Sequence, residues 1–281
     1  MSMGKRIGYG FLALVPAVGI LALQFLIVFA FLFGVTAVLS IQDGGAQGLL
    51  IYYIQAYGVM MENYTAVLVI FHVLAALLFG MWYYLLCGKK AKKESVTAFW
   101  TGRNVAGIFC IAAGFYFLVM LYMVALSWLW PDALEAYNRM MEQNGLADLT
   151  VLSTLVTIVL APIGEETVFR GLTGYFLKKA GVLFWIANFI QALLFGMSHM
   201  NFVQGSYVFL LALVLGWVYR RFGTIAAPVL LHVIFNFFGT YVATAMQNLP
   251  EEAGIYAGFA VGAVAFFTAA CVLLKKREAL T

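Results

Sequence analysis

Apolar positions along the chain fall into eight long runs that are separated by short polar connections. Several runs exceed the ~20 residues that an α-helix needs to cross a bilayer, which implies helix tilt or extension beyond the hydrocarbon. No internal repeat or low-complexity tract interrupts them. The pattern predicts membrane helices at about 8–39, 63–87, 105–130, 149–177, 182–200, 206–220, 224–244 and 254–274, with the sixth run short enough to be only partly immersed.

Composition agrees with this pattern. The 281 residues are 64% hydrophobic and 10% charged, whereas a soluble domain has roughly 25% charged residues. Cys87, Cys110 and Cys271 lie in or beside apolar runs without paired spacing, so we interpret them as core residues rather than a disulfide or thiolate metal set. The expected fold is an all-α polytopic membrane helix bundle with about eight transmembrane helices.

The charged residues sort by connection. Every basic residue except Arg139 and Arg170 falls on one predicted side, including a cluster at 89–93 that also suits contact with anionic lipid. The acidic residues Asp43, Glu62, Asp132, Glu135, Glu142, Asp148, Glu251 and Glu252 fall on the other side. The positive-inside rule then places both termini in the cytoplasm. The short loops and compact plan suggest a cell membrane, such as a bacterial inner or plasma membrane.

Two connections outside the membrane show patterns of their own. Residues 132–145 place Leu134, Tyr137 and Met141 at helical spacing, which predicts an amphipathic surface helix that ends at Gly145. Residues 42–49 are rich in glycine and predict a turn. We interpret both as surface connectors.

Charged residues interrupt the fourth apolar run, where Glu165, Glu166 and Arg170 lie at membrane depth. Each costs roughly 2.5–3.5 kcal/mol near a helix centre, and ionisable groups at that depth usually mark a functional site. Glu166 and Arg170 are four residues apart, which suits an ion pair, while Glu165 points about 100° away around the helix. Pro162 and Gly164 should loosen the helix just before this pair.

Polar faces recur on two later runs. Asn188, Gln191, Phe195 and His199 share one helical face, and His232 and Asn236 share another. Counting about 1.5 Å per residue from the cytoplasmic charges places Glu165 and Asn236 at similar depth but His199 near the outer edge. The remaining histidine, His72, has no polar company at helical spacing, so we assign it a structural role.

These residues by themselves allow three kinds of chemistry. They can activate water and stabilise an oxyanion in peptide hydrolysis. A set of Glu165, His199 and His232 can instead hold a divalent metal such as zinc, with a water position left open. The same groups can also relay protons or cations. The H-E-x-x-H motif of a conventional zincin is absent.

Three motifs occur in order on successive runs: E-E-x-x-x-R, F-x-x-x-H and H-x-x-x-N. Together, over about residues 149–242, they resemble the CPBP intramembrane protease family, which includes Rce1-type CAAX prenyl endopeptidases, Abi proteins and lysostaphin-resistance-like proteins. The resemblance implies that Glu165 is the general base and that His199 helps to hold the attacking water. It further implies that His232 and Asn236 stabilise the oxyanion, and that Glu166 and Arg170 complete the first motif.

The resemblance implies a division of the chain and a set of partners. Residues 149–242 would be the catalytic core, preceded by the helices of 1–148 and followed by a last span and basic tail at 243–281. The expected partners are membrane-embedded or lipidated peptide substrates and the lipid bilayer, with no nucleic acid. Family members are described both as metalloproteases and as using glutamate-activated water without metal, so the cofactor is either a divalent metal or none.

Two other functional classes fit parts of the pattern. A non-proteolytic membrane scaffold or bacteriocin-immunity-type regulator would use the same helices without cleaving a substrate. A transporter would need polar groups that form a path to both membrane faces, whereas the polar residues here gather mainly at one level.

Overall fold

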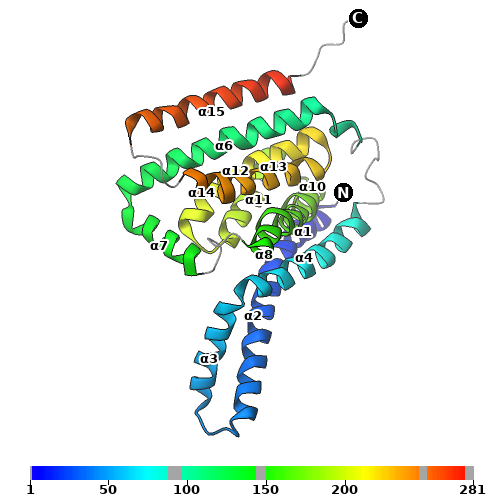
Figure 1. The fold of residues 1–281 in the computed structure, drawn as a ribbon. Coiled ribbons are helices and arrows are strands. Elements are labelled where there is room, and N and C mark those ends of the chain that lie inside the picture. Colours follow the sequence, from blue (N-terminus) through cyan, green and yellow to red (C-terminus); the bar gives the residue numbers. More distant parts are fainter. Residues whose placement is uncertain (1, 88–96, 144–149, 247–251, 276–281) are drawn as a thin grey trace, which may run out of the picture.

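The computed structural model describes residues 2–87, 97–143, 150–246 and 252–275, which form an all-α helix bundle without any strand (Figure 1). The predicted basic cluster at 89–93 and the predicted helix end at Gly145 lie outside these residues. The α-helices are α1 (Met3–Leu12), α2 (Val15–Gln42), α3 (Leu49–Glu62), α4 (Tyr64–Leu86), α6 (Gly102–Leu129), α7 (Pro131–Gln143), α8 (Val151–Thr154), α9 (Ala161–Glu166), α10 (Gly174–Lys179), α11 (Phe184–Ser198), α12 (Phe202–Phe222), α13 (Ala226–Phe237), α14 (Ala243–Met246) and α15 (Ala253–Leu274).

Seven stretches of the described chain are long and apolar enough to cross a bilayer, and α11 adds a shorter apolar helix of 15 residues. At 1.5 Å per residue α11 is about 22 Å long, less than the ~30 Å hydrocarbon core. All eight predicted runs are therefore helical. The prediction that the run at 206–220 is the short one was wrong, because α12 has 21 residues and the short helix is α11.

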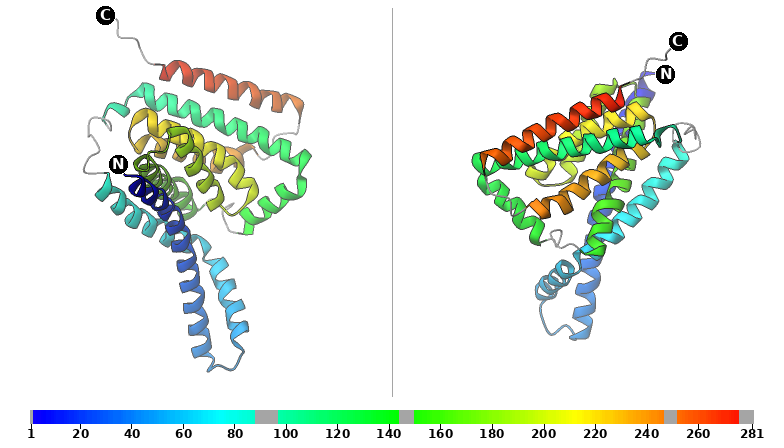
Figure 2. Two further views of the ribbon diagram at one scale, coloured as in Figure 1. Left: turned by 180° about the vertical axis from the view of Figure 1, so that it is seen from behind. Right: turned by 45° about the horizontal axis from the view of Figure 1, so that its top comes forward.

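α2 and α3 form a hairpin that the pattern of apolar runs did not predict. α2 ends at Gln42, the predicted glycine-rich turn follows with Gly44 and Gly45 at positive φ, and α3 returns toward the bundle. Figures 1 and 2 show α2 and α3 side by side, projecting from the other helices. With 14 residues α3 is shorter than the ~20 residues of a membrane span, so the apolar pattern predicts a connection there rather than a helix.

The stretch from α8 to α10 is one helical rod with two π-helical segments, η2 (Leu155–Leu160) and η3 (Thr167–Thr173). The Ala161 N–H donates to the carbonyl of Val156, five residues back, which is the π-helical register. Pro162 follows immediately and has no N–H to donate. The predicted loosening of the helix before the glutamates therefore takes the form of a π-helix, a feature that is frequent at functional sites.

α12 lies at the centre of the bundle and separates two apolar clusters. Its residues Leu211 and Leu215 pack with α6, α13 and α15, whereas Val208 and Ala212 pack with α2, α4, η3 and α11. The α11–α12 crossing is close because of Gly216, where an added Cβ atom would lie 1.8 Å from the Asn188 side chain. This close packing holds α11, despite its short length, against the middle of the bundle.

The surface helix predicted at 132–145 is present as α7. Its residues Leu134, Tyr137 and Met141 are partly buried, whereas Glu135 and Arg139 on the other face are exposed, as the spacing predicted. The Tyr137 hydroxyl lies 3.2 Å from that of Tyr207 on α12, which attaches α7 to the bundle. Burial raises the pKa of Tyr137, so this hydroxyl stays protonated at neutral pH.

On the side predicted to be basic, arginine side chains donate hydrogen bonds to the ends of other helices. Arg6 of α1 donates to the carbonyl of Ala180 after α10, at 3.0 Å. Arg103 at the start of α6 donates to the carbonyl of Lys275 at the end of α15, at 2.6 Å. Arginines at helix C-termini satisfy carbonyls that the helix leaves unpaired.

Candidate active site

The two adjacent glutamates at the end of α9 have different environments. Glu166 is completely buried, whereas the Glu165 side chain keeps 18% of its surface exposed. Consecutive residues of a helix point about 100° apart, so one carboxylate enters the protein interior while the other borders it. Glu165 is therefore the carboxylate of the pair that a small molecule can reach.

Glu166 forms the ion pair that its spacing predicted. Arg170 Nη1 lies 3.0 Å from Glu166 Oε1, and both side chains are buried. Among the described residues, the other carboxylate oxygen of Glu166 and the Nε and Nη2 atoms of Arg170 have no hydrogen-bond partner. The pair thus buries two opposite charges inside the bundle, and the desolvation of both charges is costly.

His232 on α13 joins the two glutamates. Its Nδ1 atom lies 2.9 Å from Glu166 Oε1, and its Nε2 atom lies 3.8 Å from Glu165 Oε2. Because a carboxylate oxygen only accepts hydrogen bonds, Nδ1 carries a proton and donates it to Glu166. Glu166 thereby fixes the ring so that Nε2 faces Glu165.

Asn236, one turn after His232, is held by a carbonyl that the π-helix leaves free. Its Nδ2 donates to the carbonyl of Thr157 at 2.8 Å. In the register of η2 this carbonyl would pair with the N–H of residue 162, which is a proline. Pro162 therefore makes available the acceptor that orients Asn236. Only one of the two amide N–H groups of Asn236 is used in this bond.

His199 directly follows the end of α11, and Phe195 of the same helix positions it. The His199 Nδ1 atom lies 2.9 Å from the Phe195 carbonyl, so Nδ1 donates and Nε2 is left as an acceptor. His199 is partly buried, and the Glu165 carboxylate is near enough to act on its ring electrostatically. The sequence count placed His199 near the outer edge; in the structure its ring contacts the same Phe195 ring that His232 and Arg170 contact.

The Phe195 ring is a feature of the site that the predicted set of residues omitted. It is fully buried, with the Arg170 guanidinium 4.7 Å from its centroid and the rings of His199 and His232 edge-on at 4.9 and 5.8 Å. The sequence signal was its four-residue spacing from His199. Its neighbours Asn188 and Gln191, predicted to face inward with it, are buried and hydrogen-bond to backbone carbonyls of α12.

His72, which the sequence analysis assigned a structural role, lies closer to this site than its pattern suggested. The residue is 7% exposed, and its Nδ1 atom has no hydrogen-bond partner among the described residues. The charge of Glu165 acts on it from α9, which packs against α4. No local polar spacing on α4 could have indicated this proximity, because it arises from the packing of α4 against α9.

The predicted metal set of Glu165, His199 and His232 can be compared with this geometry. In the parts of the chain that the structure describes, no group of three or more His, Cys, Asp or Glu side chains is arranged to hold a metal ion. His232 directs one nitrogen to Glu166, and Nδ1 of His199 is committed to a carbonyl. The metal set stays a prediction.

Comparison with known proteins agrees with the motifs. Residues 147–238 match the family model described as type II CAAX prenyl endopeptidase Rce1-like. An Escherichia coli protein named "Uncharacterized 24.3 kDa protein" is 36% identical over 88 residues, which are 30% of this chain and 41% of that protein. The chain thus matches less than half the length of this relative. No solved structure matches the chain.

These findings define a class. Residues 147–238 form an Rce1-like domain of the CPBP family of membrane endopeptidases, and this domain carries all three motifs. It lies within a multi-pass membrane protein, given the seven apolar helices of spanning length.

Proposed function

We propose that the protein is an intramembrane endopeptidase that hydrolyses peptide bonds of membrane-embedded or lipidated peptides with a glutamate-activated water. The observation that carries this proposal is the division of labour between adjacent carboxylates. Glu166 is buried and holds both Arg170 and His232, whereas Glu165 is partly exposed and faces the other nitrogen of His232. Such a pair supplies a fixed framework and a separate base.

In this proposal Glu165 takes a proton from a water molecule that His199 Nε2 helps to hold. The water oxygen bonds to the scissile carbonyl carbon, and the electron pair of the C=O bond moves to oxygen. Glu165 then passes the proton to the amide nitrogen, the oxyanion electron pair re-forms the C=O bond as the C–N bond breaks, and a carboxylic acid and an amine leave. General base catalysis of this kind contributes about 10²–10⁴-fold.

The tetrahedral oxyanion would accept one hydrogen bond from the second N–H of Asn236 and one from His232 Nε2–H, the latter with the ring as an imidazolium that carries protons on both nitrogens. Both donors are held from behind, His232 by Glu166 and Asn236 by the Thr157 carbonyl. Donors that are fixed before the reaction need no reorganisation when charge develops, and loss of one typically costs about 10²–10³-fold in rate. The charge of Arg170 limits repulsion between the adjacent carboxylates.

The test is Glu165→Gln, compared with Glu135→Gln as a matched control on exposed α7. Membrane peptides from cells that make each variant would be compared by proteomics, and protein levels by immunoblot. We expect substrates to accumulate with Glu165→Gln and His199→Gln but not with Glu135→Gln, at equal protein levels. If Glu165→Gln cells match wild type in peptides and phenotype, the non-proteolytic scaffold is the better description.

A further inference from the structure

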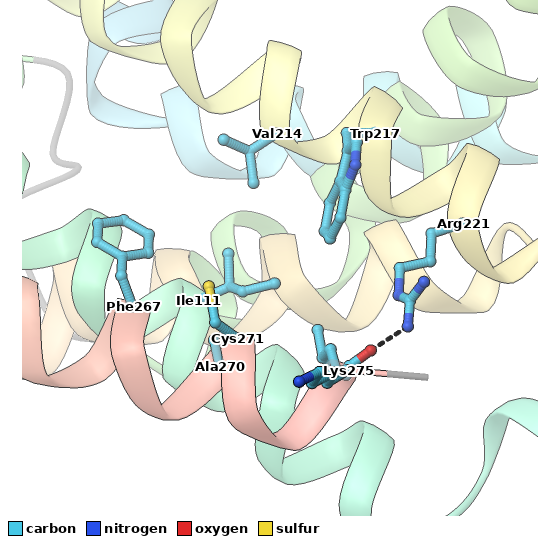
Figure 3. A pocket seen from close by; sticks show the side chains of 9 residues that line it. Ile111, Val214, Trp217, Arg221, Phe267, Ala270, Cys271 and Lys275 are labelled. Carbon is cyan, nitrogen blue, oxygen red and sulfur yellow. Dashed lines mark hydrogen bonds between the residues drawn. The ribbon is translucent and has the colours of Figure 1, made fainter. Parts of the chain in front are cut away.

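A groove away from the glutamates lies between α12 and α15, with α6 as its floor (Figure 3). Its volume is about 610 Å³, within the roughly 300–1,000 Å³ typical of ligand sites. Ile111 of α6, Val214 and Trp217 of α12, and Phe267 and Cys271 of α15 line its apolar part. Both α12 and α15 pack against α6, which leaves the space between them.

One end of the groove is cationic. Arg221 and Lys275 line it there, and Arg221 donates a hydrogen bond to the carbonyl of Leu274, which joins α12 to the end of α15 (Figure 3). Arg103 also reaches this helix end, where it donates to the Lys275 carbonyl. No acidic side chain forms an ion pair with any of these three residues within the described ranges.

Capping of the helix end uses only some of the N–H donors of these cationic side chains. The hydrogen bond from Arg221 to the Leu274 carbonyl uses one nitrogen of a guanidinium with five N–H donors. The Lys275 ammonium has no carboxylate partner among the described residues, although its backbone carbonyl is capped. An apolar channel that ends at such donors matches a ligand with an apolar chain and one anionic group.

We propose that this groove binds one anionic phospholipid, with an acyl chain along Val214, Trp217 and Phe267 and the phosphate at Arg221 and Lys275. The bundle is surrounded by lipid, and basic pockets between membrane helices on the cytoplasmic side are suited to anionic head groups. The predicted topology places this basic end in that leaflet. The groove contains neither glutamate, so a negative result for lipid binding leaves the proposed protease activity unaffected, and the reverse also holds.

The test is native mass spectrometry of the full chain exchanged into phosphatidylglycerol or phosphatidylcholine with identical acyl chains. We expect one retained phosphatidylglycerol and weak retention of phosphatidylcholine. Each of Arg221→Gln and Lys275→Gln should lower phosphatidylglycerol affinity about fivefold, the usual effect of one basic residue near the membrane surface. Cys271→Phe, which fills the groove from an exposed position, should lower retention of both lipids.

Arg220→Gln is the matched control. Arg220 is the neighbour of Arg221, but its guanidinium stacks on the Phe184 ring at 4.2 Å, outside the groove. Size-exclusion profiles and thermal unfolding would show that all variants fold. Equal retention of the two lipids, an equal loss with Arg220→Gln, or undiminished retention by folded Cys271→Phe would each overturn the proposal.

Discussion

The Nδ1 atom of His232 lies 2.9 Å from Oε1 of Glu166, the same oxygen that accepts the hydrogen bond from Arg170. One buried carboxylate oxygen thus connects α13 with the rod that carries the glutamates. The contact spans 66 residues of sequence and fixes which histidine nitrogen faces Glu165.

Glu166→Gln should destabilise the protein more than Glu165→Gln. The amide keeps the shape of the side chain but leaves Arg170 as an uncompensated buried charge, which costs about 3–5 kcal/mol. Glu165 is partly exposed, and its buried neighbour His232 keeps the hydrogen bond to Glu166 when Glu165 is changed. Thermal unfolding in detergent would compare the two variants. A larger loss of stability with Glu165→Gln would contradict the assignment of Glu166 as the structural member.

The double variant Glu166→Leu/Arg170→Met separates stability from function. Replacing both members of a buried ion pair with apolar residues is often neutral or stabilising. We expect stability near that of wild type but loss of peptide cleavage, because His232 no longer has an acceptor for Nδ1–H. Full activity in a stable double variant would show that Glu166 does not position His232.

Pro162→Ala should lower activity without lowering stability. Alanine supplies an N–H that can compete with Asn236 for the Thr157 carbonyl, and it has a higher helix propensity than proline by about 3 kcal/mol. The freed Asn236 side chain would then be poorly placed, so we expect kcat to fall about tenfold or more with little change in KM. The same substitution at Pro16, far along the chain at the start of α2, is the control. Unchanged kcat in Pro162→Ala would refute this role.

Phe195→Leu should lower the cleavage rate while the protein still folds. The variant removes the ring over which Arg170 stacks, a contact worth about 0.5–2 kcal/mol, and the surface that the two histidine rings contact. Phe189→Leu, on the same helix, is the matched control, because Phe189 is 52% exposed and contacts Phe209 rather than the site. Cleavage assays should show a defect only for Phe195→Leu. Equal defects in both would point to general packing of α11.

Metal dependence can be measured directly. The glutamate mechanism predicts that purified protein retains activity after dialysis against a chelator and holds less than stoichiometric zinc by elemental analysis. Stoichiometric zinc together with chelator-sensitive activity would instead support the set of Glu165, His199 and His232. In that case His199→Gln should lower the zinc content as well as the rate, whereas Asn236→Ala should lower the rate alone.

The sequence by itself determined the class of fold, the positions of the helical spans and the inward polar faces. These are local properties, since burial in lipid demands long apolar runs and helical periodicity fixes which residues share a face. The Glu166–Arg170 pair was predictable for the same reason, because four-residue spacing within one helix brings the two side chains together.

Only the tertiary structure decided how those faces meet. Three contacts of the site join separate helices. They are the hydrogen bond from His232 to Glu166, the hydrogen bond from Asn236 to the Thr157 carbonyl, and the contact of the Phe195 ring with His232. Their geometry depends on helix crossing and on the π-helical register around Pro162, which departs from the regular 3.6-residue period that sequence reading assumes. The groove between α12 and α15 likewise exists only because both helices pack on α6.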